Sequence, residues 1–244
     1  MNARSTAELP REVSSFVEPD DAAPVSVIRE TANVAVKPLL RGVSHQVAFF
    51  IAIFATGFLF ARAPSGAPSS ATLVFGASMV FLFGVSALYH RIDWSAEARQ
   101  RMRRLDHAAI FVLIAGGYTP LFALVAKPET GGHGALVSIW IGALVGVVKS
   151  LAWPRAPKWL TALLCVGLGW MVIFEVAARA PVIGPVATWS LVASGVTYSI
   201  GALVYALKRP NPFPRTFGYH EVFHAIVIGA SAFLFTHVSL VVLR

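Results

Sequence analysis

Cysteine and charge are both scarce in this sequence. Cys165 is the single cysteine among 244 residues, which excludes an intramolecular disulfide framework and a Cys-rich metal site. Charged residues make up only 13% of the chain, hydrophobic residues make up 56%, and the mean hydropathy is +0.68. This balance excludes an ordinary soluble domain, because a chain of this length cannot enclose repeated apolar runs of about twenty residues in one core.

The basic residues also lack the clustering that nucleic-acid-binding proteins show. The formal net charge is +8, but the lysines and arginines separate apolar runs and form neither one basic helix nor one basic tail. The first forty residues have no apolar run of the kind found in a secretory signal peptide. We therefore expect no nucleic-acid partner, an uncleaved and partly disordered cytosolic tail over residues 1–40, and one membrane domain over residues 41–244.

Seven apolar runs follow the tail, and short segments rich in proline, glycine or charge separate them. The runs cover residues 43–62, 70–91, 104–126, 134–153, 159–178, 186–207 and 219–242. Each run is long enough to cross a bilayer as a helix. The sequence predicts an all-α polytopic membrane protein, a bundle of seven transmembrane helices in the cell membrane. A membrane lipid is the expected ligand or substrate.

The distribution of lysine and arginine over alternate loops predicts the orientation. One side of the membrane receives 16 of the 20 basic residues, and the other receives Arg62, Lys127, Arg179 and Arg244. Short cytosolic loops carry the excess of positive charge in membrane proteins. The N-terminus is therefore expected in the cytosol, and an odd number of spans places the C-terminus outside.

Four ionisable residues stand within spans, where such residues are costly and often functional. His90 ends the second span, Asp106 begins the third, and His220 and His224 lie in the first turns of the seventh. The predicted orientation places all four at the cytosolic end of the bilayer. Three helices that are distant in sequence thus bring three imidazoles and one carboxylate to a similar depth.

His220 and His224 are four residues apart, so a helix presents both rings on one face at a spacing that can bind one metal. With His90 they make a set of three histidines, the ligand set of a catalytic zinc that activates water. Asp106 is either a fourth ligand or, as we prefer, a general base beside the metal. Ser86 lies one turn before His90 and either orients that ring, holds a substrate carbonyl, or bonds its own helix backbone. The competing interpretation of the histidine pair is simple capping or interfacial placement.

Four segments in order and spacing resemble the hemolysin III family of bacterial membrane proteins, which is related to progestin and adipoQ receptors and, more distantly, to alkaline ceramidases. The segments are KPLLRGVSH, SALYH, LDHAAIFVLIAGGYTP and HEVFH, at residues 37–45, 86–90, 105–120 and 220–224. The resemblance implies a seven-helix bundle with Zn²⁺ near the cytosolic face. It also implies lipid amide hydrolysis, on ceramide-like substrates especially, an activity that belongs mainly to the receptor and ceramidase branches.

The resemblance also implies roles for single residues. It maps the zinc ligands onto His90, His220 and His224, the water-holding carboxylate onto Asp106, and the family's serine onto Ser86. Two positions depart from the pattern. Gly117 stands where many relatives have threonine, and Leu234 stands where some receptor relatives have another histidine.

Other polar residues have simpler interpretations. Arg41 and His45 begin the first span, either as topological anchors or at a substrate mouth. Lys149 and Glu175 lie near opposite ends of their spans, where they are expected to extend toward the interfaces. His107 points about 100° away from Asp106 on a helix and is expected to be interfacial.

Three functions compete at this point. The first is an intramembrane zinc-dependent hydrolase of a lipid amide or ester bond. The second is a non-enzymatic pore-former or lipid-responsive receptor whose zinc is structural. The third, a haem-binding cytochrome, is least favoured, because axial histidines approach a haem from opposite faces whereas His220 and His224 share one face.

Overall fold

The computed structural model describes residues 37–125, 132–153 and 155–244, and residues 37–244 form one compact unit. Residues 1–36 of the predicted tail over residues 1–40 lie outside the described residues. The described part is built from α-helices, in agreement with the predicted all-α membrane fold. The elements are α2 Val43–Arg62, α3 Ala67–Arg91, α4 Ala96–Leu124, α5 Gly132–Ala152, α6 Lys158–Trp170, α7 Ile173–Ile183, α8 Pro185–Leu207 and α9 Tyr219–Val242.

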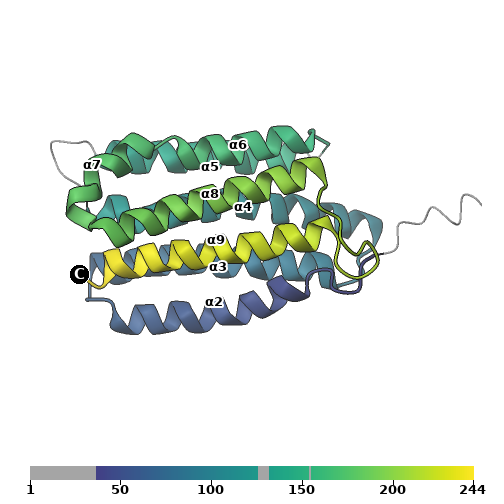
Figure 1. The fold of residues 1–244 in the computed structure, drawn as a ribbon, viewed down its shortest axis with the longest axis horizontal. Coiled ribbons are helices and arrows are strands. Elements are labelled where there is room, and N and C mark those ends of the chain that lie inside the picture. The colour runs from purple at the N-terminus through teal and green to yellow at the C-terminus, as the bar shows by residue number, and fades with distance from the viewer. Residues whose placement is uncertain (1–36, 126–131, 154) are drawn as a thin grey trace, which may run out of the picture. The chain divides into compact units, whose positions relative to one another are not determined.

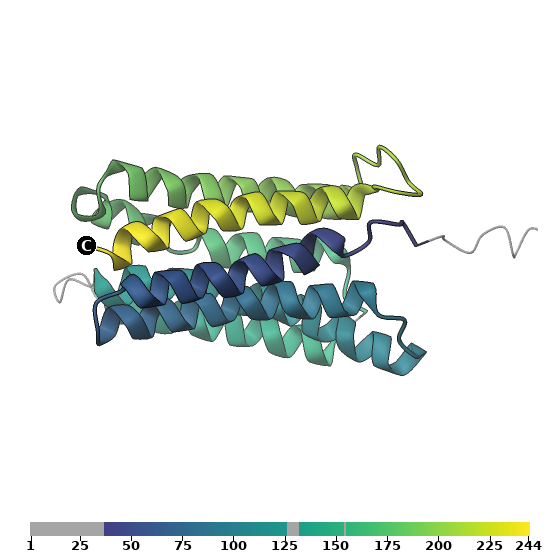
Figure 2. The ribbon, with the colours of Figure 1, turned by 90° about the horizontal axis from the view of Figure 1, so that it is seen from below.

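Within this unit the long helices run side by side and alternate in direction (Figures 1 and 2). The most extensive packing joins α8 to α9, α3 to α4, α4 to α5 and α2 to α3. α9 also contacts α2, α3 and α4, so the last helix closes the bundle against the first ones. We call the end at which α2 and α9 begin and α3 ends the histidine end.

The outer surface of α2 shows why these helices require lipid. Phe50, Phe54 and Phe58 recur every four residues and are exposed, with Phe54 at 76%. Spacing of four residues places them on one face of the helix. Such a stripe of exposed aromatic side chains is unfavourable in water but is stable against acyl chains.

Among the described residues, six helices are long and apolar enough to cross a membrane, and a seventh span results if α6 and α7 count as one bent span. The span predicted over residues 159–178 is divided between two helices: α6 ends at Trp170, and α7 begins at Ile173 with a bend of 40°. Arg179 connects α7 to the end of α4. It is buried, donates to the Val125 carbonyl and pairs with Glu175 at 2.5 Å.

The third span begins earlier than its apolar run. Residues 92–103 were predicted as a loop, but the helix starts at Ala96. Ser95 caps it by accepting a hydrogen bond from the Ala98 N–H at 3.4 Å, and Glu97 stands in the first turn, where a negative charge favours the helix. Apolar periodicity cannot reveal two charged turns that extend beyond the lipid.

The charge distribution and the directions of the helices together predict on which side of the membrane each loop and the C-terminus lie. A periplasmic-type reporter fused after Arg244 is expected to be active, and a cytosolic reporter at the same position is expected to be silent, because α9 begins at the basic histidine end and runs away from it. A reporter inserted in the α8–α9 loop after Arg215 is expected to behave oppositely. A cytosolic C-terminus would contradict the count of seven spans.

Candidate functional site

Three histidines from two helices meet at the histidine end. His90 lies in the last turn of α3, while His220 and His224 lie in the first two turns of α9. Their candidate ligand atoms all lie within 4.8 Å of one another, and the Nε2 atoms of His90 and His220 are 3.0 Å apart. His90 and His224 are buried, and His220 is half-buried. The structure thus brings together all three residues that the sequence predicted as ligands.

The start of α9 fixes the direction of its two histidines. Glu221 accepts a hydrogen bond from the Gly218 N–H at 2.8 Å, which satisfies an otherwise unpaired donor at the helix start. Glu221 is also buried and forms an ion pair with Arg41 from the segment before α2. Since Glu221 stands between the two histidines, this ion pair ties their backbone to the first helix.

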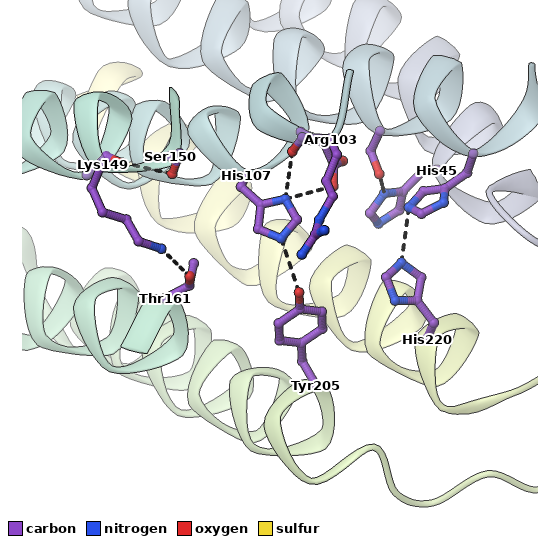
Figure 3. A network of polar contacts seen from close by, with 12 residues as sticks. His45, Arg103, His107, Lys149, Ser150, Thr161, Tyr205 and His220 are labelled. Carbon is purple, nitrogen blue, oxygen red and sulfur yellow. Dashed lines mark hydrogen bonds and ion pairs between the residues drawn. The ribbon is translucent and has the colours of Figure 1, made fainter. Parts of the chain in front are cut away.

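His45 is a site residue whose role the sequence did not reveal. Its ring is buried and stacks on the His224 ring, with centroids 3.7 Å apart and planes 8° from parallel. Its Nδ1 lies 2.8 Å from the Ser86 Oγ, a contact drawn in Figure 3. A histidine in the first turn of an apolar span looks like an interfacial anchor. Only the packing of α2 against α3 and α9 shows that it faces inward.

Ser86 links His45 to the predicted carboxylate. The Ser86 hydroxyl contacts His45 and is placed to donate a hydrogen bond to the Asp106 carboxylate. A carboxylate only accepts, so the hydroxyl donates to Asp106 and can accept from the His45 Nδ1–H. Among the described residues, the group of close ligand atoms contains the three histidines alone. Asp106 therefore lies outside the three-histidine group.

Gly42 allows the first helix to approach His90. Its φ is +80°, a conformation that side chains other than glycine rarely adopt, and an added Cβ would lie 2.5 Å from the His90 Cβ. The start of α2 therefore makes three contacts. Arg41 pairs with Glu221, Gly42 lies against His90, and His45 stacks on His224. The start of α2 supports every helix that carries a candidate ligand.

Replacing Gly42 with alanine is expected to lower the melting temperature and to weaken metal binding by about tenfold or more, because the new methyl group displaces His90. Gly66→Ala is the matched control. Gly66 also has a positive φ, +93°, but no atom lies within 4 Å of the added Cβ. Metal titration and thermal denaturation of both variants separate backbone strain from displacement of His90. Equal metal affinity in the two variants would contradict the assigned contact.

A central cavity of about 440 Å³ opens beside the histidines. Its wall near the histidine end includes His45, Ser86, His90, Asp106 and His224. Farther along the bundle the lining becomes largely apolar, with side chains from α4, α6, α8 and α9 such as Ile114, Val166, Leu191, Val227 and Leu234. Its volume lies in the range of small-molecule sites, and its lining suits an acyl chain with a polar group at the histidine end.

The two departures from the family pattern are one structural feature. Gly117 and Leu234 both line the cavity, and a Cβ at residue 117 would lie 2.8 Å from the Leu234 Cδ2. Glycine at residue 117 thus leaves the room that the leucine occupies. Together they make this part of the cavity apolar.

The donor set fits a zinc ion. In a tetrahedral site with Zn–N about 2.0–2.1 Å, ligand nitrogens are about 3.3 Å apart, and the three histidines already hold candidate atoms within 4.8 Å. His224 is buried, and its Nδ1 has no hydrogen-bond partner within residues 37–125, 132–153 and 155–244. Three histidine ligands would leave one of four tetrahedral positions for water or substrate.

The other polar residues lie beside this site. His107 donates from Nδ1 to the Arg103 carbonyl at 2.7 Å, and its Nε2 lies 3.1 Å from the Tyr205 hydroxyl (Figure 3). It lines the cavity and is therefore not simply interfacial. Lys149 donates to Thr161 instead of extending freely to the interface. Neither residue belongs to the histidine group.

Comparison with known proteins gives a consistent picture. A family model described as "Haemolysin-III related" matches residues 33–235. The Hemolysin-3 homolog of Bacillus subtilis (strain 168) is 33% identical over 162 residues, which cover 66% of this chain and 72% of that protein. Hemolysin-3 of Bacillus cereus is 29% identical over 200 residues, covering 81% and 88%. The adiponectin receptor protein of Drosophila melanogaster is 24% identical over 204 residues, covering 68% of this chain and 41% of the receptor.

Proposed function

This chain belongs to the haemolysin-III-related family of multi-span membrane proteins, and on that basis we propose that it is a zinc-dependent hydrolase of lipid amide or ester bonds. The observation that carries the proposal is the arrangement of three histidines around one point, with Asp106 close by, at the polar end of a cavity suited to an acyl chain. A structural zinc needs neither an open coordination position nor a cavity.

The ligands in this proposal are His90, His220 and His224. A zinc ion supplies Lewis acidity, which polarises the substrate carbonyl and makes water a better nucleophile. The apolar cavity binds the acyl chain and excludes bulk water from its length. The scissile carbonyl is thereby held at the histidine end.

Asp106 is the proposed general base. Its carboxylate takes a proton from the attacking water as the new C–O bond forms, and it returns that proton to the leaving amine or alcohol as the C–N or C–O bond breaks. In this proposal Ser86 donates to the carboxylate and holds it in one orientation, while His45 contacts the Ser86 hydroxyl. Water is consumed, and a fatty acid and an amine or alcohol are released.

The proposal is tested with the full chain purified in a neutral detergent and supplied with a ceramide-like lipid amide and a matched ester. We expect release of fatty acid that a strong chelator abolishes and that added Zn²⁺ restores. Leakage from lipid vesicles, measured in parallel, identifies the alternative of a pore-former. Vesicle leakage without hydrolysis, unaffected by the chelator, would overturn the proposed reaction.

A further inference from the structure

A second, basic pocket adjoins the central cavity at the histidine end. Arg103 and Arg104 of α4 and Lys149 of α5 line it, together with His107, Thr161 and Tyr205. Its volume is about 20 Å³, which is room for one group the size of a water molecule, such as a single phosphate oxygen. No aspartate or glutamate is among the described residues that line it.

The positive-inside rule explains why basic residues occur at this end, but it does not explain their enclosure. Arg99 lies on the same helix and is exposed, as the rule requires. Arg104 is half-buried, and its Nε is enclosed without a hydrogen-bond partner in the described part of the chain. Lys149 donates to the neutral hydroxyl of Thr161, so that contact leaves its positive charge uncompensated. Enclosed donors and charges of this kind favour an anionic acceptor.

The basic pocket and the central cavity share part of their walls. Arg103, His107, Thr161 and Tyr205 line both hollows. Figure 3 shows His107 directed at Tyr205, and Lys149 directed at Thr161, across the gap between the helices. A molecule with an anionic head and an apolar chain can therefore place its head among the cations and its chain in the cavity.

The shared wall also reaches the histidine site. The Tyr205 ring lies 6.2 Å from the His220 ring, and Tyr205 is hydrogen-bonded to His107. A head group in the basic pocket is thus separated from a candidate zinc ligand by about one aromatic ring.

We propose that the basic pocket binds a phosphate oxygen of the head group of an anionic lipid whose acyl chain lies in the central cavity. Two guanidinium groups and one ammonium group match the charge of about −1.5 to −2 on a phosphomonoester, and arginine pairs with phosphate through two parallel hydrogen bonds. This inference goes beyond the proposed hydrolysis, since binding of the head group needs no metal at the histidines.

The experiment measures binding of short-chain phosphatidic acid to the full chain in neutral detergent, with and without chelator. Arg104→Gln and Lys149→Gln are each expected to weaken binding by about tenfold or more. The matched control Arg99→Gln removes an exposed charge from the same helix and is expected to change binding by less than about twofold. Zinc content and hydrolysis, measured on the same samples, report separately on the proposed function.

Two further probes need no variant. Diacylglycerol of the same chain length is expected to bind the wild type at least about tenfold more weakly than phosphatidic acid, and inorganic phosphate is expected to bind weakly and to compete. Inorganic phosphate that binds as tightly as the lipid would identify a site for free phosphate and overturn the lipid assignment. Equal binding of phosphatidic acid and diacylglycerol, or unchanged affinity in both Arg104→Gln and Lys149→Gln, would overturn the pocket itself.

Discussion

Asp106→Asn is expected to slow hydrolysis of a lipid amide by about 100-fold or more while the bound zinc is retained. Asparagine keeps the size of the side chain and can still contact Ser86, but it cannot accept a proton from the attacking water. Asp106 lies outside the close group of ligand atoms, so the change removes no proposed ligand. Turnover, zinc content and melting temperature are measured on the same preparation.

Asp93→Asn is the matched control, because Asp93 is exposed and pairs only with Lys37 among the described ion pairs. It is expected to leave turnover unchanged. Loss of zinc and of thermal stability together in Asp106→Asn would indicate a fourth ligand of a structural site. Retained zinc with unchanged turnover would remove Asp106 from the reaction.

Alanine at any one of the three histidines is expected to weaken zinc binding by at least about 100-fold and to abolish measurable hydrolysis. Two imidazoles leave the ion under-coordinated in a site of low dielectric constant, where its charge is poorly compensated. Isothermal titration of the metal-free His90→Ala, His220→Ala and His224→Ala proteins with Zn²⁺ measures the loss. Metal affinity and activity are expected to fall together.

His237→Ala provides the control on the same helix. His237 is buried, donates from Nδ1 to the Ala187 carbonyl at 2.9 Å, and lies outside the histidine group. Because a carbonyl only accepts, the Nδ1 of His237 is the donor, and its loss is expected to lower stability without removing zinc. If all three ligand variants still bind zinc as the wild type does, the zinc is held by other residues.

The sequence predicted the helices well, because a run of about twenty apolar residues has few alternatives to a membrane-spanning helix. It predicted poorly where the structure depends on contacts between distant residues. Arg179 was assigned to an outer loop from its charge, yet it is buried against the end of α4 and paired with Glu175. No periodicity in α7 reveals a carbonyl acceptor 54 residues away.

The candidate site shows the same division. The sequence predicts one depth for four ionisable residues, His90, Asp106, His220 and His224. Because successive spans alternate in direction, this depth alone brings them to the same end of the bundle. His45 is also an ionisable residue at this predicted depth, but its stacking on His224 depends on the side from which α2 packs. Gly42 gives the one local signal of this packing, a glycine directly before the helix, and its meaning appears only beside His90.

The most direct test of the zinc site is elemental analysis of the purified wild-type protein. The chain is expressed with ample zinc, purified in neutral detergent without a metal-affinity tag, and analysed for zinc per mole of protein. Three clustered histidines predict about one zinc per chain, removable by a strong chelator and regained on titration. A protein that thermal denaturation shows to be folded, but that contains no zinc and takes up none on titration, would contradict the metal site. It would also contradict the hydrolase activity proposed from that site.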